Sequence, residues 1–428
     1  MSPISENRDP LLTLDFLRAL PKTDLHVHLD GSLRLSSLLE LASEYHVDLP
    51  SYTEAGLREL VFKERYKDLG DYLTGFKYMT AVLQSESALE RAGYELAQDN
   101  QQEGVRYVEV RFAPQLHVHR YLNPISVLKA VDRGLRHATD EFNRRPEVQS
   151  GEEPPFDYGI IVCAMRAFRE GTSEYFTQLL RSHQYAPDRE VFGLASLELA
   201  RAAVKARDEY GLPIVGFDLA GEEKGYPPED HREGYEYAHR NFLMKTVHAG
   251  EAYGPESIFQ AITELHADRI GHGYFLLDPA MIRDEDIEDR EAYVKSLSQY
   301  IADRRITIEV CLTSNLQTIP EVKDLSQHAF NRMREARLST TICTDNRTVS
   351  STTVTNELDQ AVKYCNIDQK QLKSIIIYGF KRSFYHGSYL KKRRYVRQII
   401  DYYETIEKRF MDQASAQSGK IHAAPPSA

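Results

Sequence analysis

The sequence predicts an α/β protein folded as a (β/α)8 TIM barrel, with a helical insertion after the first strand and extra N- and C-terminal helices. Eight short apolar runs rich in β-forming residues recur along the 428 residues, and longer segments with helical periodicity separate them. Strands that alternate with helices build a parallel sheet, and eight such units close it into a barrel. A doubly wound open sheet is the alternative, but no glycine-rich dinucleotide fingerprint follows the first run.

Each expected strand is a short apolar run that ends near polar or turn-forming residues. The eight runs are TDLHVHL (23–29), VRYVEVRFA (105–113), DYGIIVCAM (157–165), PIVGFDLA (213–220), KTVHAG (245–250), DRIGHG (268–273), ITIEVCL (306–312) and STTICTD (339–345). The clearest helical patterns between them cover residues 87–101, 194–211 and 257–265. Together these segments supply the alternation that a barrel requires.

Several regions add to the minimal barrel. We expect a leading helix within residues 1–20 that stops at Pro21, and an amphipathic helical insertion over residues 50–80. Residues 276–305 form an unusually long acidic crossover, and the charged, proline-rich segment 144–157 is expected to be an exposed loop.

The chain is expected to form one domain. Residues 1–410 are assigned to a single barrel, and residues 411–428 to a mobile C-terminal tail. The basic run at 391–397 is interpreted as the solvated face of a C-terminal helix and not as a binding patch.

The composition limits the class of partner. A net charge of −11 argues against a nucleic acid or an anionic membrane, which would need a basic surface. The N-terminus lacks a signal-peptide pattern and no apolar run approaches a membrane span, so we expect a cytoplasmic protein. Four widely spaced cysteines without a CxxC pair indicate buried thiols and not disulfides. The sequence indicates no oligomeric state.

The first strand carries two histidines at a spacing that suits a shared site. Side chains alternate faces along a strand, so His26 and His28 in HVHLDGS point the same way, and Asp30 begins the turn that follows. Two imidazoles on one face can bind a metal, but a metal site needs further ligands from elsewhere in the chain.

Polar residues gather where the other expected strands end. In a barrel these ends meet at one mouth, which is where catalytic groups lie. The residues are Asp30 after the first strand, DLAGEE (218–223) after the fourth, His248 and Glu251 after the fifth, His272 after the sixth, and Asp345 with Asn346 after the eighth. Each alone has a structural explanation, such as a helix cap or a satisfied core histidine. Their coincidence on one face favours a catalytic site.

The motifs HVHLDGS, DLAGEE, HAGE, RIGHG, EVCLTSN and TDN, in this order and spacing, resemble those of the adenosine deaminase family of metal-dependent amidohydrolases. The resemblance covers about residues 14–390. It implies one zinc ion per chain, held by four protein ligands. These are His26, His28, His248 and Asp345.

The resemblance also implies catalytic roles. Glu251 matches the acid that protonates N1 of a purine, which requires a raised pKa. His272 matches the base and hydroxide-orienting residue. Hydroxide attack at C6 of adenosine or 2′-deoxyadenosine would then release ammonia and leave inosine or its deoxy analogue, a step of purine salvage.

Substrate recognition is expected at four positions. Gly221 matches the glycine whose backbone N–H contacts purine N3, Asp30 matches the residue that binds a ribose hydroxyl, and His28 is assigned to substrate binding as well as to the metal. Asn346 stands where many relatives have an Asp that meets N7, and an amide donates there without needing protonation. The apolar residues expected in a lid are Phe62, Leu69, Tyr72, Leu73 and Phe76.

The sequence leaves other functions open. A sibling deaminase could act on adenine, aminodeoxyfutalosine or an N6-modified nucleoside or nucleotide, and Asn346 leaves that choice less constrained. A two-metal amidohydrolase would need a bridging lysine after the fourth strand, and VGFDLAG offers none. A binding protein without activity would have lost Glu251 or His272. Leu312 replaces a proline frequent in the family, with local consequences only.

Several histidines are not assigned to the site. A second HVH, at His117 and His119, follows Pro114 and is expected at the surface or against the lid. Five further histidines, among them His328, have no partner at a recognisable spacing.

Overall fold

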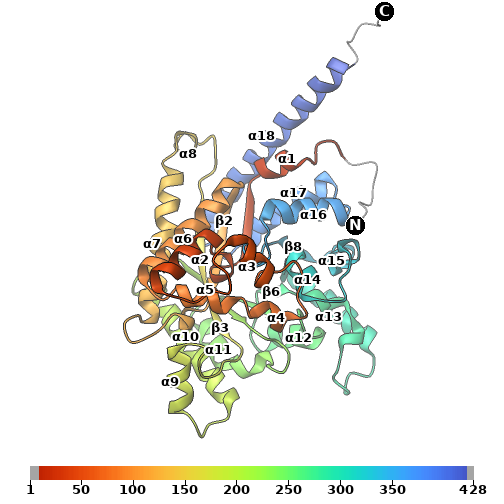
Figure 1. The fold of residues 1–428 in the computed structure, drawn as a ribbon. Coiled ribbons are helices and arrows are strands. Elements are labelled where there is room, and N and C mark those ends of the chain that lie inside the picture. Colours follow the sequence, from red (N-terminus) through yellow and green to blue (C-terminus); the bar gives the residue numbers. More distant parts are fainter. Residues whose placement is uncertain (1–8, 422–428) are drawn as a thin grey trace, which may run out of the picture.

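The computed structural model describes residues 9–421, with side chains described as far as residue 416. Eight parallel strands form one sheet in the order β1 to β8, and helices surround it (Figure 1). The strands are β1 (Lys22–His28), β2 (Val105–Phe112), β3 (Asp157–Met165), β4 (Ile214–Ala220), β5 (Met244–Ala249), β6 (Arg269–His272), β7 (Thr307–Val310) and β8 (Ser339–Ile342). Every strand overlaps one of the expected runs, so the predicted barrel is confirmed.

The sheet closes where β1 meets the residues that follow β8. Val27 pairs in parallel with Asp345. The His28 N–H donates to the Asp345 carbonyl at 2.7 Å, and the Asp345 N–H donates to the His26 carbonyl at 2.8 Å. The closure therefore places three of the expected ligands side by side.

Helices cover the outside of the barrel between successive strands. They are α6 (Glu86–Gln102), α7 (Pro124–Asn143), α8 (Pro146–Gln149), α9 (Glu174–Ser182), α10 (Asp188–Asp208), α11 (Arg232–Arg240), α12 (Pro255–Thr263), α13 (Arg290–Arg304), α14 (Leu312–Thr318), α15 (Ala329–Glu335), α16 (Val354–Tyr364) and α17 (Gln369–Arg382). Their starts follow from the sequence, since Ser85, Asn123 and Thr353 each accept a backbone N–H bond as N-cap residues. The expected helices at 87–101, 194–211 and 257–265 are confirmed.

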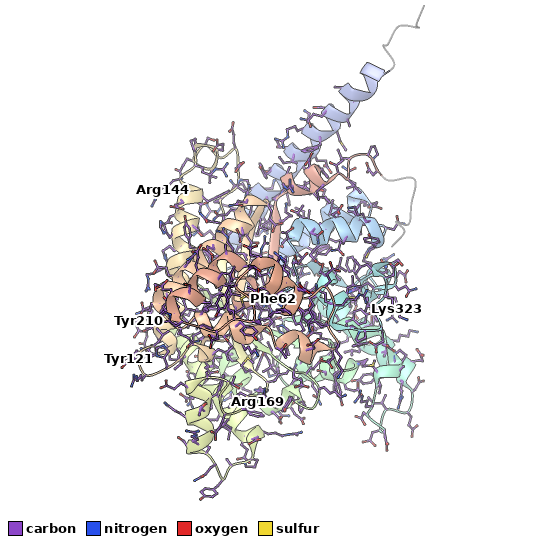
Figure 2. All side chains as sticks on the ribbon, viewed as in Figure 1. Phe62, Tyr121, Arg144, Arg169, Tyr210 and Lys323 are labelled. Carbon is purple, nitrogen blue, oxygen red and sulfur yellow. The ribbon has the colours of Figure 1, made fainter. Side chains whose placement is uncertain are left out.

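The insertion after β1 consists of short helices and not of one long one. They are the 3-10 turn η1 (Asp30–Ser32), α2 (Leu35–Tyr45), α3 (Glu54–Leu60), α4 (Leu69–Leu73) and α5 (Phe76–Val82). Thr53 caps α3 and Asp68 caps α4. Phe62, labelled in Figure 2, lies in this insertion and is buried, as is Tyr72. The expected helical insertion is confirmed, and of its expected apolar residues Leu69 is also buried whereas Leu73 and Phe76 are half-buried.

Both described ends of the chain are helical. α1 (Leu14–Ala19) is a single short helix that ends before Pro21, and residues 1–8 lie outside the described part. α18 (Tyr389–Ile421) continues across residue 411 and projects beyond the barrel (Figure 1). The expected boundary at 410 therefore falls inside a helix, because nothing in the sequence there stops it. Residues 422–428 of the expected mobile tail lie outside the described part.

The structure also describes the acidic crossover, the cysteines and the longest helices. The acidic crossover begins with the 3-10 turns η4 (Tyr274–Leu277) and η5 (Pro279–Met281) and ends in α13. All four cysteines are buried and unpaired, as expected. No helix within residues 9–421 is both long enough and apolar enough to cross a membrane.

Candidate active site

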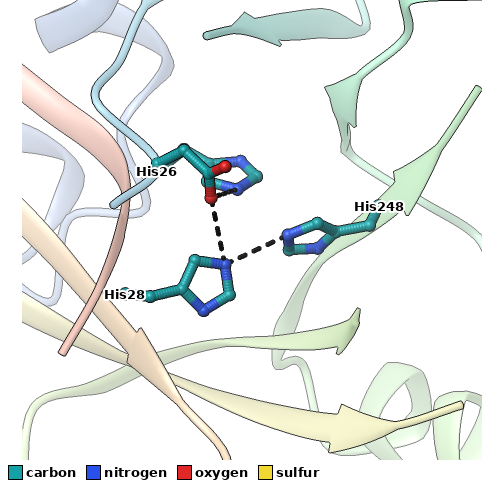
Figure 3. A group of neighbouring side chains, drawn as sticks. His26, His28 and His248 are labelled. Atoms are coloured by element: carbon teal, nitrogen blue, oxygen red, sulfur yellow. Dashed lines mark hydrogen bonds and ion pairs between the residues drawn. The ribbon is translucent and has the colours of Figure 1, made fainter. Parts of the chain in front are cut away.

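Three histidines and an aspartate converge at the mouth of the barrel. His26 and His28 come from β1, His248 from β5, and Asp345 from the segment after β8, and their ligand atoms lie within 4.8 Å of one another. Figure 3 shows the three labelled imidazoles, with His28 Nε2 lying 3.1 Å from His248 Nε2. Asp345 Oδ1 lies 3.4 Å from His26 Nε2 and 3.5 Å from His28 Nε2. The expected ligand residues are thus brought together.

The histidine rings of this cluster are oriented from behind by carboxylates. His26 Nδ1 lies 2.7 Å from Glu309 Oε2, and His248 Nδ1 lies 3.0 Å from Asp218 Oδ2. Because an ionised carboxylate only accepts hydrogen bonds, both rings donate from Nδ1 and direct Nε2 toward the cluster.

The electrostatics of the cluster suit a cation. His26 Nε2 is buried without a hydrogen bond and faces Asp345 Oδ1 at 3.4 Å, so a cation between these two atoms would satisfy both of them. Burial lowers the pKa of His28 and of His248, so both imidazoles are neutral, which is the form that binds a metal. The donor set of this structure therefore fits a divalent metal ion.

A buried arginine joins the two orienting carboxylates. Arg111 donates to Asp218 Oδ2 and to Glu309 Oε2, each at 2.9 Å, and all three side chains are fully buried. Arg269 donates to the other Glu309 oxygen at 2.6 Å. The two guanidinium groups offset the desolvation of the carboxylates, which allows charges to remain inside the barrel.

This layer of buried charges was not predicted from the sequence, although a signal was present. Arg111 lies within the apolar run VRYVEVRFA, and Glu309 lies within ITIEVCL. A charge inside a strand expected to be buried must find a buried partner. Asp218 was quoted as part of DLAGEE, but it was given no role.

Glu251 follows β5 and faces the cluster. Burial, followed by the negative charges of Asp345 and Glu223, raises the pKa of Glu251 well above its ordinary value, which favours the protonated carboxyl. Its Oε2 lies 3.7 Å from His272 Nε2. A proton donor and an imidazole thus border the same space beside the ligands.

The loop that carries Glu251 is organised by Glu223, whose role the sequence analysis also missed. Glu223 Oε2 accepts the backbone N–H groups of residues 251, 252 and 253 at 3.0, 2.7 and 3.0 Å. Its Oε1 accepts the N–H of Gly250 at 2.8 Å and the hydroxyl of Ser257 at 2.5 Å. One buried carboxylate therefore satisfies a whole turn of backbone, including the N–H of Glu251 itself.

Two site residues adopt backbone conformations that are uncommon for residues with a side chain. His272 has φ 62° and Asp345 has φ 62°, both in the left-handed region. Such positions persist when surrounding bonds over-determine them, and they cluster at functional sites.

The positions expected to recognise substrate lie around the same mouth. Asp30 begins η1 and is buried, and burial raises its pKa to about 6. Gly221 follows β4 with φ 107°, a conformation that favours glycine. The roles expected for both in substrate binding remain predictions.

Asn346 is bonded to the insertion. Its Nδ2 donates to the Tyr72 hydroxyl at 2.8 Å, and that hydroxyl lies 2.8 Å from Ser350 Oγ. Gly31 leaves the room that the amide needs, because an added Cβ would lie 1.7 Å from Asn346 Oδ1. The expected lid is therefore in contact with an expected recognition residue.

The second HVH lies against the end of the insertion, which is one of its two expected positions, and of its two histidines only His119 is partly exposed. His117 is fully buried, with Nδ1 2.9 Å from the carbonyl of Leu83. His119 Nε2 lies 3.1 Å from the carbonyl of Gln84. Both contact the segment after α5, because β2 ends at Phe112 and the turn that follows folds under the insertion.

Comparisons with known proteins find one sequence family and several structures with the same fold. The sequence pattern of the family described as "Adenosine deaminase" matches residues 21–402. The adenosine deaminase of Mycobacterium ulcerans is 34% identical over 378 residues, covering 87% of this chain and 92% of its own. An adenine deaminase from Arthrobacter aurescens superposes with a TM-score of 0.71 at 21% identity, over 90% of this chain and 99% of its own. An Arabidopsis N6-mAMP deaminase superposes with a TM-score of 0.68 at 25% identity, with the same coverage of each chain.

Proposed function

This chain belongs to the adenosine deaminase family of metal-dependent aminohydrolases, and we propose that it deaminates adenosine and 2′-deoxyadenosine hydrolytically to inosine, or 2′-deoxyinosine, and ammonia. The observation that carries this proposal is the pairing of Glu251, a buried carboxyl with a raised pKa, with a four-residue metal site at the same mouth. Such a pair supplies an acid and an activated water, which hydrolysis of an aromatic amine requires.

Zinc is the proposed ion. His26, His28, His248 and Asp345 would hold it, since three imidazole nitrogens and one carboxylate oxygen suit zinc. When bound, the ion lowers the pKa of a water molecule, so that hydroxide is available near neutral pH. Glu309 and Asp218 would keep the imidazoles of His26 and His248 in place for such an ion.

Glu251 and His272 are the proposed catalytic residues. The carboxyl of Glu251 gives its proton to N1 of the purine while C6 accepts the attacking oxygen, so the ring nitrogen does not accumulate negative charge. His272, whose Nε2 lies 3.7 Å from Glu251 Oε2, would orient the attacking oxygen. As the C6–N bond breaks, the remaining proton of the attacking oxygen passes to the amine, which leaves as ammonia, and the product keeps C6=O with the proton on N1. The first proton of the water restores the Glu251 carboxyl.

Four residues would select the substrate. The N–H of Gly221 would meet purine N3, the Asn346 amide would donate to N7, and Asp30 would accept a ribose hydroxyl beside His28. Asp30 favours a nucleoside, since a phosphate at that position would need a basic partner. The proposed substrate is thus a small purine nucleoside.

The test is an ammonia-release assay on the purified, zinc-loaded protein. The panel contains adenosine, 2′-deoxyadenosine, adenine, 5′-methylthioadenosine, AMP, N6-methyl-AMP and aminodeoxyfutalosine. We expect fast turnover of the two nucleosides, with adenine and AMP inert. If only another compound of the panel is deaminated, the roles given to Asp30, Asn346 and the insertion are wrong. If no compound is deaminated while zinc is bound, the proposal is overturned.

A further inference from the structure

A buried chain of hydrogen bonds runs from the backbone of α15 to His272. The Phe330 N–H donates to His328 Nδ1 at 3.0 Å. His328 Nε2 lies 3.2 Å from Asn315 Oδ1, and Asn315 Nδ2 lies 3.2 Å from His272 Nδ1. His328, Asn315 and His272 are all buried, so water does not compete for these contacts.

Chemistry sets the direction of every bond in this chain. A backbone N–H can only donate, so His328 Nδ1 is an acceptor, and the neutral ring carries its proton on Nε2. That proton requires an acceptor, which identifies the facing atom of Asn315 as its oxygen. The Asn315 amide nitrogen therefore faces His272 and donates to His272 Nδ1. A flipped Asn315 would oppose two donors to each other and is excluded.

His328 stays neutral, as this direction requires. Burial lowers the pKa of His328 to about 3, and its ring packs edge-on against Tyr274 at 5.0 Å between centroids. The sequence analysis found no partner for this histidine because its partner belongs to a different helix, α14.

We propose that the chain of Phe330, His328 and Asn315 holds His272 in the tautomer that carries its proton on Nε2, so that His272 is a hydrogen-bond donor into the reaction space and not the base. The Nε2–H points toward the space that Glu251 Oε2 borders 3.7 Å away. With Nδ1 occupied by a donated N–H and Nε2 already protonated, neutral His272 has no free lone pair for a proton. The catalytic role of this donor rests on the proposed function, whereas the tautomer of His272 does not. Asn315 and His328 are positioning residues.

The tautomer is read directly by long-range 1H–15N correlation of the imidazole nitrogens in zinc-loaded protein labelled on histidine. The His272 signals are assigned by their loss in His272→Gln. We expect a protonated Nε2 and an unprotonated Nδ1. A proton on Nδ1 would overturn the proposal whether or not the protein deaminates adenosine.

Asn315→Asp exchanges the donor for an acceptor at nearly constant shape. We expect the His272 proton to move to Nδ1 in the spectrum, zinc content to stay unchanged, and kcat to fall about 10²-fold with little change in KM, as for loss of one preorganised donor. Asn331→Asp is the matched control, since Asn331 donates at 2.9 Å to Ser326 O and lies outside the chain. An unchanged spectrum or an unchanged kcat in Asn315→Asp would overturn the proposal.

His328 provides the rescue. His328→Leu removes the donor that orients Asn315 and should lower kcat, whereas His328→Gln offers an amide N–H to Asn315 Oδ1 and should restore most of it. Equal kcat losses in the two variants would show a packing role only and contradict the proposal. If no panel compound is turned over by the wild type, the proposed function fails while the wild-type spectrum still decides the tautomer.

Discussion

Replacing Glu223 by glutamine should weaken the hydrogen bonds that hold the loop carrying Glu251 in place. The two carboxylate oxygens of Glu223 accept four backbone N–H bonds and the Ser257 hydroxyl. Glutamine keeps one carbonyl oxygen and turns an NH2 group toward the remaining N–H donors. At least one buried N–H loses its acceptor and the other bonds lose their charge, so we expect the free energy of unfolding to fall by about 3–5 kcal/mol.

The same substitution should alter the pH dependence in one direction. The negative charge of Glu223 is one of the causes that raise the pKa of Glu251. Removing it makes Glu251 easier to ionise, and the reaction needs the protonated acid. The alkaline limb of the kcat/KM profile should therefore move to lower pH, and a displaced loop should lower kcat as well.

Glu222 is the matched control, because it is the neighbouring glutamate of DLAGEE and is exposed. The assays are thermal unfolding at constant zinc and kcat/KM against pH for both variants. Glu222→Gln should behave as the wild type. Equal stability and equal pH profiles for the two variants would refute the role given to Glu223. Ser257→Ala, which removes one of the five donors, should cost only about 1 kcal/mol.

The remaining predictions concern the metal, the acid and the purine contact. Glu251→Gln should retain zinc and lower kcat by about 10²–10⁴-fold, the range for a lost general acid; near wild-type turnover would exclude it as the donor. His248→Ala should lose bound metal by elemental analysis, and Asp218→Asn should weaken metal affinity by about 10–100-fold; full zinc content in His248→Ala would contradict the ligand set. Asn346→Asp should keep activity at low pH and lose it as the new carboxyl ionises, because an ionised carboxylate cannot donate to N7. An identical pH profile would show that this side chain does not meet N7.

The sequence by itself determined the barrel and the convergence of its ligands. Eight apolar runs of strand length, separated by helical patterns, leave few alternatives to a (β/α)8 arrangement, because parallel strands need a crossover between them. The spacing of His26 and His28 predicts that both side chains lie on one face, because side chains in a strand alternate with a period of two residues. Ligands at strand ends could be recognised because this fold brings those ends to one mouth.

Only the tertiary structure shows which buried residues hold the ligand and catalytic side chains in place. Arg111, Asp218 and Glu309 lie on three strands, and Glu223 reaches a loop that follows a different strand from its own. The direction of the His328 chain depends on three segments meeting in space. Hydrogen bonds between distant segments leave no periodic trace in the chain, because each partner alone is simply a polar residue in an apolar run. Their pairing is set by the closure of the barrel, which no local pattern encodes.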